Sequence, residues 1–248
     1  MARIVFVLTA AAELRLRDES MLATGFWAQE FVEPYHIFLE HGHTVDIATP
    51  QGRPAALDET CFDPKFHDGD IGRAANLREQ LMAIDDWQAP LSLERLALTD
   101  NDAQAVFFPG GHGPMADLAE SSAAGNLIKR VYARGGLIGA VCHGPAALLP
   151  ASSADKWLFA GLSMTCFSAD EERAAGLYDR LPWQLAAKLI EAGAKPSFAP
   201  VGERHVVVDT RLYTGQNPAS AAPLAWQMAR ELKKLSSRDK TSCGTPCA

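Results

Sequence analysis

One stretch of the sequence constrains the fold most: an apolar strand that leads directly into a helix, with a cysteine at the junction. Residues 137–141 read Leu-Ile-Gly-Ala-Val, an apolar run typical of a strand covered on both faces. Cys142 follows, and Pro145 stands in the first helical turn, where its missing N–H is not needed. Ala140 and Gly144 flank the cysteine with small side chains. This pattern predicts a nucleophile elbow with cysteine in place of serine.

The elbow predicts a reactive cysteine. The partial positive charge at a helix N-terminus favours thiolate over thiol, and the predicted helix begins directly after Cys142. His143 follows the cysteine and is expected to exchange a proton with the sulfur. The alternatives are a buried structural cysteine and a solvent-facing histidine at the helix start. Cys-His-Gly-Pro at a strand-to-helix junction favours the catalytic interpretation.

Apolar strands alternate with helical patterns along the chain, which predicts a mostly parallel sheet with helices on both faces. We expect strands over 3–9, 44–48, 105–108, 137–141 and 212–214, and helices over 25–40, 122–134 and 218–235. Pro34 falls inside the first of these helices and predicts a kink or a break.

The domain organisation predicted from the sequence is simple, because no internal repeat and no linker is visible. We expect one α/β domain over residues 1–235, with surface insertions at about 10–24 and 50–100. The last segment, 236–248, is polar and is predicted to be disordered.

Composition excludes several classes of protein. Of the 248 residues, 48% are hydrophobic and 21% charged, as in ordinary globular proteins. With a net charge of -7 and no basic patch, nucleic acid is not an expected partner. No apolar run approaches the roughly 18 residues of a membrane span, so no membrane is expected either.

Cysteine usage predicts the compartment. The five cysteines are odd in number and irregularly spaced, which indicates neither a disulfide framework nor a zinc site. A reducing cytoplasm is therefore expected. Cys243 and Cys247, in the polar tail, are not expected to form a site. The complete set is Cys61, Cys142, Cys166, Cys243 and Cys247.

Glycines follow a second buried strand. In a mostly parallel sheet, ligands bind at the carboxyl ends of the strands. Gly110 and Gly111 come directly after the strand 105–108. There they would let backbone N–H groups form an oxyanion pocket together with the N–H of His143. A plain tight turn requires the same glycines. His112 comes next and is expected to line the site.

An acid is expected to orient His143, as in a catalytic triad. The candidates form the run Asp170, Glu171 and Glu172, which follows a predicted strand. Acidic residues are also favoured at helix starts for electrostatic reasons, so chemistry alone leaves all three open.

A fourth acid, Glu30, stands in an apolar helix face. Burial raises the pKa of a carboxyl group, so this side chain is expected to stay protonated and to hydrogen-bond the sulfur or shuttle a proton. A surface glutamate at the helix edge is the alternative. Its apolar neighbours are Phe26, Trp27 and Phe31.

Four segments of the chain resemble the ThiJ/PfpI superfamily of class I glutamine amidotransferase-like proteins. They are Ala-Val-Cys-His-Gly-Pro at 140–145, Phe-Pro-Gly-Gly-His-Gly at 108–113, Thr-Gly-Phe-Trp-Ala-Gln-Glu-Phe at 24–31 and Leu-Tyr-Thr-Gly-Gln-Asn-Pro at 212–218. The sequence is most similar to the heat-inducible chaperone-like branch, whose members act as glyoxalase III. The resemblance implies a flavodoxin-like three-layer sandwich and a homodimer.

The resemblance also implies roles for particular residues. Cys142 would be the nucleophile, His143 its partner, and Glu30 the acid that contacts the sulfur. This branch places its third acid a few residues after a phenylalanine. Phe167 then selects Glu172, with the preceding glutamate as the second choice.

The implied activity is conversion of methylglyoxal or related 2-oxoaldehydes to 2-hydroxy acids such as lactate, without glutathione, metal or organic cofactor. A true glutamine amidotransferase would carry a late His-x-Glu, but valines follow His205. The other functions considered are a holdase chaperone or oxidative-stress protein, a protein deglycase, and a cysteine amidohydrolase or peptidase.

Overall fold

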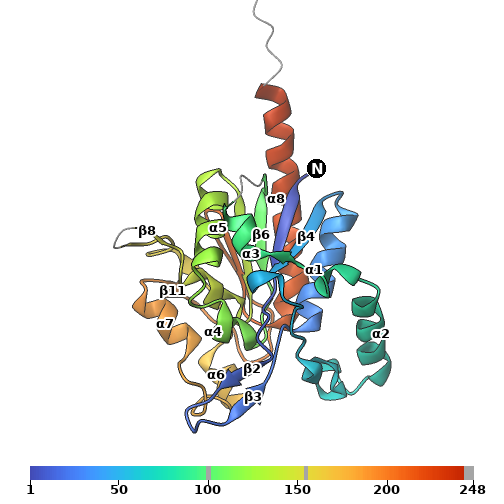
Figure 1. Cartoon of the computed structure of the whole chain (residues 1–248), viewed down its shortest axis with the longest axis vertical. Helices are drawn as coiled ribbons and strands as arrows, with labels where there is room; N and C mark the ends of the chain where they lie inside the picture. Colours follow the sequence, from blue (N-terminus) through green and yellow to red (C-terminus); the bar gives the residue numbers. More distant parts are fainter. Residues whose placement is uncertain (99–101, 154–155, 243–248) are drawn as a thin grey trace, which may run out of the picture.

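The centre of the computed structural model is a seven-stranded sheet in the order β12-β13-β7-β6-β1-β4-β5 (Figure 1). The structure describes residues 1–98, 102–153 and 156–242. All neighbouring strands of this sheet pair in parallel except β12 and β13, so the predicted mostly parallel sheet is confirmed. The strands are β1 (Arg3–Val7), β4 (Thr44–Thr49), β5 (Leu91–Ser92), β6 (Ala105–Phe108), β7 (Leu137–Val141), β12 (Val206–Asp209) and β13 (Leu212–Gly215).

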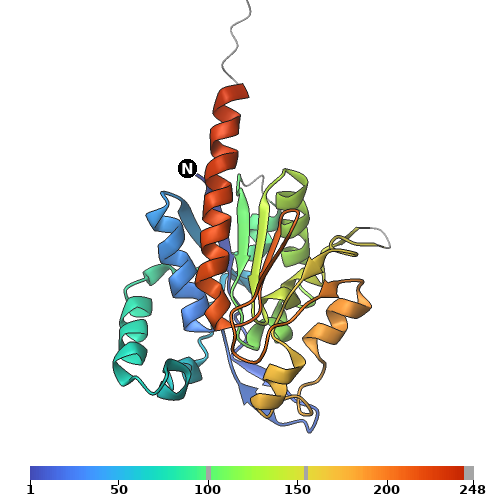
Figure 2. The same ribbon diagram turned by 180° about the vertical axis from the view of Figure 1, so that it is seen from behind.

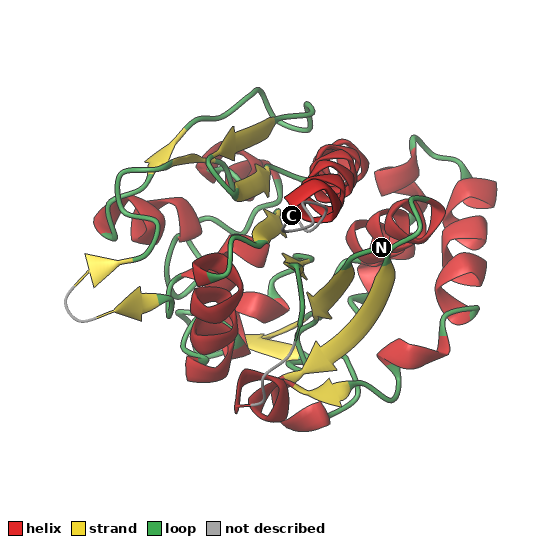
Figure 3. Ribbon diagram, turned by 90° about the horizontal axis from the view of Figure 1, so that it is seen from above, coloured by secondary structure: helices red, strands yellow, loops and turns green. Residues whose placement is uncertain are grey.

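Helices cover both faces of the sheet. Figure 2 shows α1 (Ala28–Glu40) and α8 (Ala221–Ser242) in front of one face. The other face carries α3 (Leu93–Leu98), α4 (Gly113–Asp117) and α5 (Ser122–Ala133). Seen from above, the strands lie between these layers (Figure 3). The strands are buried on both faces, which explains their continuous apolar runs. The predicted three-layer α/β sandwich is thus confirmed.

The two segments predicted as insertions have structure of their own. Residues 10–24 contain the hairpin of β2 (Glu13–Arg15) and β3 (Met21–Ala23). Residues 50–98 contain short 3-10 turns and α2 (Ile71–Met82), which lies beside α1 (Figure 1). The remaining elements are the short pairs β8 (Ser152–Ser153) with β9 (Lys156–Trp157) and β10 (Ser163–Met164) with β11 (Lys195–Pro196), and the helices α6 (Ala169–Ala174) and α7 (Leu185–Glu191).

The helix α1 runs through Pro34 without a break, so the prediction of a break was wrong. Pro34 is buried, and packing of the helix outweighs the loss of one backbone hydrogen bond. The helix α8 continues to Ser242, although 236–248 was predicted to be disordered. No glycine or proline occurs in this polar stretch before Gly244, so an established helix extends easily into it. Residues 243–248 and their two cysteines lie outside the described residues.

No helix in the described part of the chain combines the length and the apolar character that crossing a membrane would require.

An aromatic cluster holds α1 against the sheet. Phe6 of β1 is fully buried, and its ring centroid lies 4.9 Å from that of Phe107, 5.7 Å from Phe31 and 5.9 Å from Phe38. Burying aromatic rings in offset or edge contacts contributes several kcal/mol. Because Phe31 directly follows Glu30, this cluster also fixes the position of that acid.

We therefore expect Phe6→Ala to lower the free energy of unfolding by about 3–5 kcal/mol through the lost transfer energy and the remaining cavity. Phe198→Ala is the matched control, because this phenylalanine is 42% exposed and its loss should change stability by only about 0.5 kcal/mol. Denaturant unfolding of both variants checks this, and equal losses would contradict the assignment of Phe6 to the core.

Candidate active site

Cys142 occupies a strained turn at the carboxyl end of β7. Its φ of 59° lies in the left-handed region, which non-glycine residues rarely adopt and which marks functional turns. Two backbone hydrogen bonds hold this conformation. The N–H of Cys142 donates to the carbonyl of Gly215 at 2.9 Å, and the N–H of Phe167 donates to the carbonyl of Cys142 at 2.8 Å. The chain thus makes the sharp elbow that the sequence predicts.

The helix after the elbow differs from the prediction. Residues Gly144–Leu148 form a short 3-10 helix, not a regular α-helix. A Cβ on Gly144 would lie 2.1 Å from the carbonyl oxygen of Phe108. The small residue is therefore required by the neighbouring strand β6.

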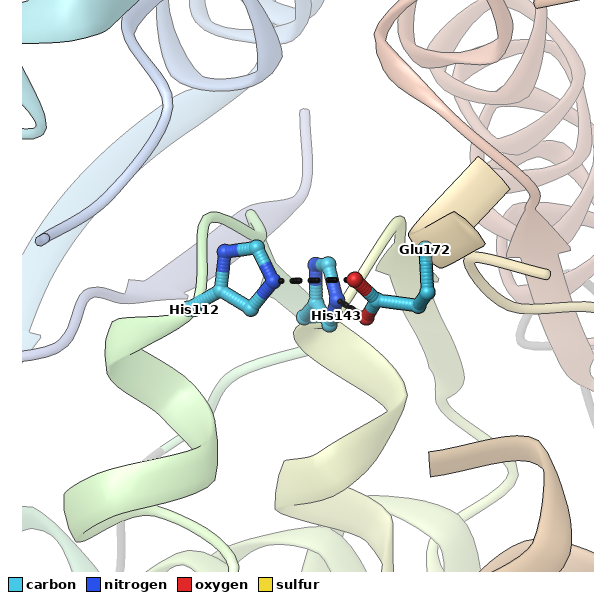
Figure 4. A group of neighbouring side chains, drawn as sticks. All are labelled: His112, His143 and Glu172. Atoms are coloured by element: carbon cyan, nitrogen blue, oxygen red, sulfur yellow. Dashed lines mark hydrogen bonds and ion pairs between the residues drawn. The ribbon is translucent and has the colours of Figure 1, made fainter. Parts of the chain in front are cut away.

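His143 joins the cysteine to an acid. Its Nδ1 lies 3.3 Å from the Sγ of Cys142, and its Nε2 lies 2.6 Å from Oε1 of Glu172 (Figure 4). With its proton on Nε2 and donated to the carboxylate, the ring presents the lone pair of Nδ1 to the thiol. Burial and the neighbouring His112 lower the pKa of His143, so the ring is neutral and able to accept a proton at neutral pH.

Glu172 holds two histidines at once. Its second oxygen, Oε2, lies 3.3 Å from Nε2 of His112, whose ring centroid is 4.0 Å from that of His143 (Figure 4). Burial opposes ionisation of Glu172, but the two imidazoles outweigh it and lower the carboxyl pKa to about 2. The acid is therefore a carboxylate throughout the neutral range.

The three acids that chemistry left open have different surroundings. Asp170 is exposed and pairs with Arg173. Glu171 closes the capping box of α6 with Ser168. Glu172 alone among them contacts the histidine. A one-residue step around a helix turns a side chain by about 100°, which is why the sequence pattern alone did not separate neighbours.

Glu30 reaches the thiol from α1. It is fully buried, and its Oε2 accepts a hydrogen bond of 2.7 Å from the N–H of Gly110. Its Oε1 has no hydrogen-bond partner among the described residues. Burial raises the pKa of Glu30 to about 8, so the carboxyl group is protonated at neutral pH. A Cβ on Gly110 would lie 2.7 Å from the Cβ of Cys142 and 2.8 Å from Oε2 of Glu30, which shows how closely these groups pack.

The glycine loop contributes differently from the prediction. The N–H of Gly110 is occupied by Glu30 and is not free to hold an oxyanion. The N–H of Gly111 approaches the Cys142 sulfur and favours its ionised form. Gly111 has a φ of 84°, and a Cβ there would lie 2.1 Å from the carbonyl of Gly25, so only glycine fits. His112 lines the site, as predicted.

The sequence predicts that Cys142 is ionised in the resting site, but the structure favours the protonated thiol. Burial raises the pKa of Cys142 well above that of a free thiol. A short 3-10 turn is too weak a dipole to reverse this. Cys61 and Cys166 are buried as well, and burial raises the pKa of Cys61 to about 12.

Cys142 and His143 open onto a pocket of about 1450 Å³, which neither Cys61 nor Cys166 lines. The ring of Trp27 meets that of Phe66 edge to face, with centroids 5.0 Å apart, on one wall. Phe66 was not predicted as a lining residue, because it lies in an irregular segment with no periodic pattern. Other lining residues are Leu22, Gly111, His112, Phe167, Arg204 and Asn217, and the ring of Phe167 stacks on His143 at 4.7 Å.

His112, His143 and Glu172 are the one group within the described residues whose donor atoms have the spacing of metal ligands, all within 4.8 Å of one another. Each carboxylate oxygen is already bonded to one histidine, and these hydrogen bonds account for the spacing.

Comparison with known proteins places this site in a family. A Staphylococcus aureus (strain bovine RF122 / ET3-1) protein named protein/nucleic acid deglycase HchA is 30% identical over 239 residues, covering 91% of this chain and 79% of its own length. The Francisella tularensis Rapid Encystment Protein 24 KDa superposes with a TM-score of 0.77 at 28% identity, covering 94% of this chain and 99% of its own. Glyoxalase III from Candida albicans has the same fold, with a TM-score of 0.77 at 22% identity. The superposition covers 92% of this chain and 96% of the Candida chain.

Residues 20–231 match the model of the DJ-1/PfpI family, and this range includes the elbow, the glycine loop and all the acids of the site. The chain is a member of the DJ-1/PfpI family.

Proposed function

We propose that this protein is a glyoxalase III-like lyase that converts methylglyoxal or a related 2-oxoaldehyde to a 2-hydroxy acid without glutathione or a cofactor. One observation carries the proposal: the Cys142 thiol lies between a neutral histidine and a protonated glutamic acid at the floor of a pocket. A base and an acid on either side of one nucleophile are what this isomerisation needs.

The first step forms a carbon–sulfur bond. Nδ1 of His143 takes the proton from Sγ, and Glu172 stabilises the resulting imidazolium. The thiolate attacks the aldehyde carbon and gives a hemithioacetal. In this proposal the N–H groups of Gly111 and His143 stabilise the negative charge that develops on its oxygen.

The second step moves hydrogen between the two carbons. His143 first returns its proton to the hemithioacetal oxygen and then, as a neutral base, removes the proton from the former aldehyde carbon. Glu30 donates its proton to the neighbouring carbonyl oxygen, which gives an enediol. His143 delivers a proton to the second carbon while Glu30 takes back the hydroxyl proton on the first carbon, which produces a thioester of the 2-hydroxy acid and restores both groups. The first carbon is oxidised and the second is reduced, so no external electron acceptor is required. Water then hydrolyses the thioester and restores the thiol.

The test is consumption of methylglyoxal without glutathione. Cys142→Ala removes the nucleophile and should lower the rate at least about 10³-fold. Cys61→Ala is the matched control, since it removes a buried thiol away from the pocket and should keep activity near that of wild type. Equal consumption by wild type and Cys142→Ala would end the proposal.

The acid assigned to Glu30 predicts a pH dependence. Below pH 8 the carboxyl holds its proton, and above it the proton is lost, so kcat/KM of the wild type should fall above about pH 8. Glu30→Gln keeps a neutral donor that does not titrate. The variant should be about 10²-fold slower and should lack this alkaline fall.

Glu40→Gln is the control for this profile, because Glu40 is an exposed residue at the end of the same helix. It should retain the alkaline limb. If Glu30→Gln retained the limb too, another group would be responsible for it.

The size of the pocket favours a second candidate, a deglycase that removes the same aldehyde from a larger molecule. A volume of about 1450 Å³ far exceeds what a three-carbon substrate fills. The experiment uses Nα-acetylarginine that has first reacted with methylglyoxal. A deglycase shortens the lifetime of the adduct in proportion to enzyme concentration. A glyoxalase alone consumes only the aldehyde released spontaneously, so the rate of adduct loss reaches a ceiling.

That this protein forms a homodimer and that it lies in the cytoplasm stay predictions from its sequence. Light scattering at several protein concentrations would measure the oligomeric state directly.

A further inference from the structure

A second buried carboxylate lies beside the proposed site and takes no part in the proposed reaction. Glu171 is 3% exposed, and its two oxygens accept five hydrogen bonds. Oε2 accepts from the N–H and Oγ of Ser168, each at 2.9 Å, and from Nε2 of Gln216 at 3.1 Å. Oε1 accepts from Nδ2 of Asn217 at 2.8 Å and from the N–H of Gly202 at 3.2 Å. Five donors hold this side chain in one position.

These donors come from segments that also hold the nucleophile. Gln216 and Asn217 directly follow Gly215, whose carbonyl accepts the N–H of Cys142. Ser168 directly follows the residue whose N–H donates to the Cys142 carbonyl. The hydrogen bonds of Glu171 therefore connect the segment after Gly215 to the segment after Phe167. These are the two segments whose backbone groups bond to Cys142.

The position of Glu171 in α6 explains why such an anchor matters. The helix is short, running over Ala169–Ala174, and Glu171 and Glu172 are adjacent. Side chains of adjacent helical residues point about 100° apart. A small rotation of this helix would withdraw Glu172 from His143. The five hydrogen bonds of Glu171 oppose that rotation, since any turn of the helix would leave buried donors without partners.

We infer that Glu171 is a positioning residue, which locks the first turn of α6 so that Glu172 holds His143 against the thiol. The late Gly-Gln-Asn-Pro motif, at 215–218, supplies two of the donors and thereby acts on the same acid. This inference rests on the proposed Cys142–His143–Glu172 pairing, but it does not depend on which substrate the thiol meets.

The test uses alkylation of Cys142 by iodoacetamide at pH 7, which reports on the thiol without any substrate of the proposed enzyme. Glu171→Gln should slow alkylation by about three- to tenfold, because Glu172 then holds His143 less well. Loss of the negative charge alone would act in the opposite direction, since Glu171 raises the pKa of Cys142. Unchanged or faster alkylation would therefore overturn the inference.

A double variant separates positioning from a general loss of stability. If Glu171 acts through Glu172, then Glu171→Gln/Glu172→Gln should react no more slowly than Glu172→Gln alone. Multiplying effects would show that the two residues act independently and would contradict the proposal. Asp170→Asn is the matched control, because it removes a charge from the same helical turn at an exposed position. It should react like wild type.

Each variant is checked for folding by circular dichroism and thermal unfolding. If Glu171→Gln fails to fold, Ser168→Ala removes one hydroxyl donor from the same carboxylate, together with the N-cap hydrogen bond that this hydroxyl accepts from the N–H of Glu171. Ser168→Ala should slow alkylation about two- to threefold relative to wild type. In the Glu172→Gln background, the same substitution should cause no further slowing. If Ser168→Ala were alkylated at the wild-type rate, the inference would be contradicted. Failure of methylglyoxal turnover with these alkylation results intact would refute only the proposed substrate.

Discussion

The site depends on two backbone hydrogen bonds that hold Cys142 in a left-handed conformation. Without them a non-glycine residue would relax to negative φ, and the sulfur would leave the edge of the sheet. The partners belong to Gly215 at the end of β13 and Phe167 before α6. Each partner begins a segment that carries further site residues. The strain at one residue and the arrangement of the whole site therefore have the same origin.

Different neighbours give two buried glutamates opposite protonation states. Glu30 has one backbone donor and an apolar surrounding, which raises its pKa to about 8. Glu172 faces two imidazoles, which lower its pKa to about 2. Environments that separate the pKa values of like groups assign acid and base roles within one site. The protonated state of Glu30 opposes stability, because the unfolded chain releases this proton near pH 4.5 while the folded chain keeps it up to about pH 8.

The sequence predicted the layers, the elbow and the glycine loop, because periodicity and small residues report on strands and tight turns. It did not predict that Glu30 occupies the N–H of Gly110, since that contact joins residues 80 positions apart. The sequence did not single out which acid of 170–172 lies beside His143. Adjacent acidic residues at the start of a helix have the same composition and the same preference for that position. The helix beyond Leu235 was missed for a related reason: a polar composition does not distinguish a disordered tail from a helix that continues away from the core.

A thiol that stays protonated argues for catalysis over redox sensing. Sensor cysteines react with oxidants as exposed, standing thiolates. Cys142 is buried, and burial disfavours its ionised form. Nδ1 of His143 lies 3.3 Å from the sulfur and is the base proposed to take its proton. The transfer would occur as the sulfur attacks an electrophile in the pocket. The thiolate is then formed at the moment of attack, which limits side reactions with peroxide and with large electrophiles that do not reach the pocket floor. In the proposed reaction, deprotonation is coupled to substrate binding, and this coupling would follow from the same burial that raises the pKa of Glu30.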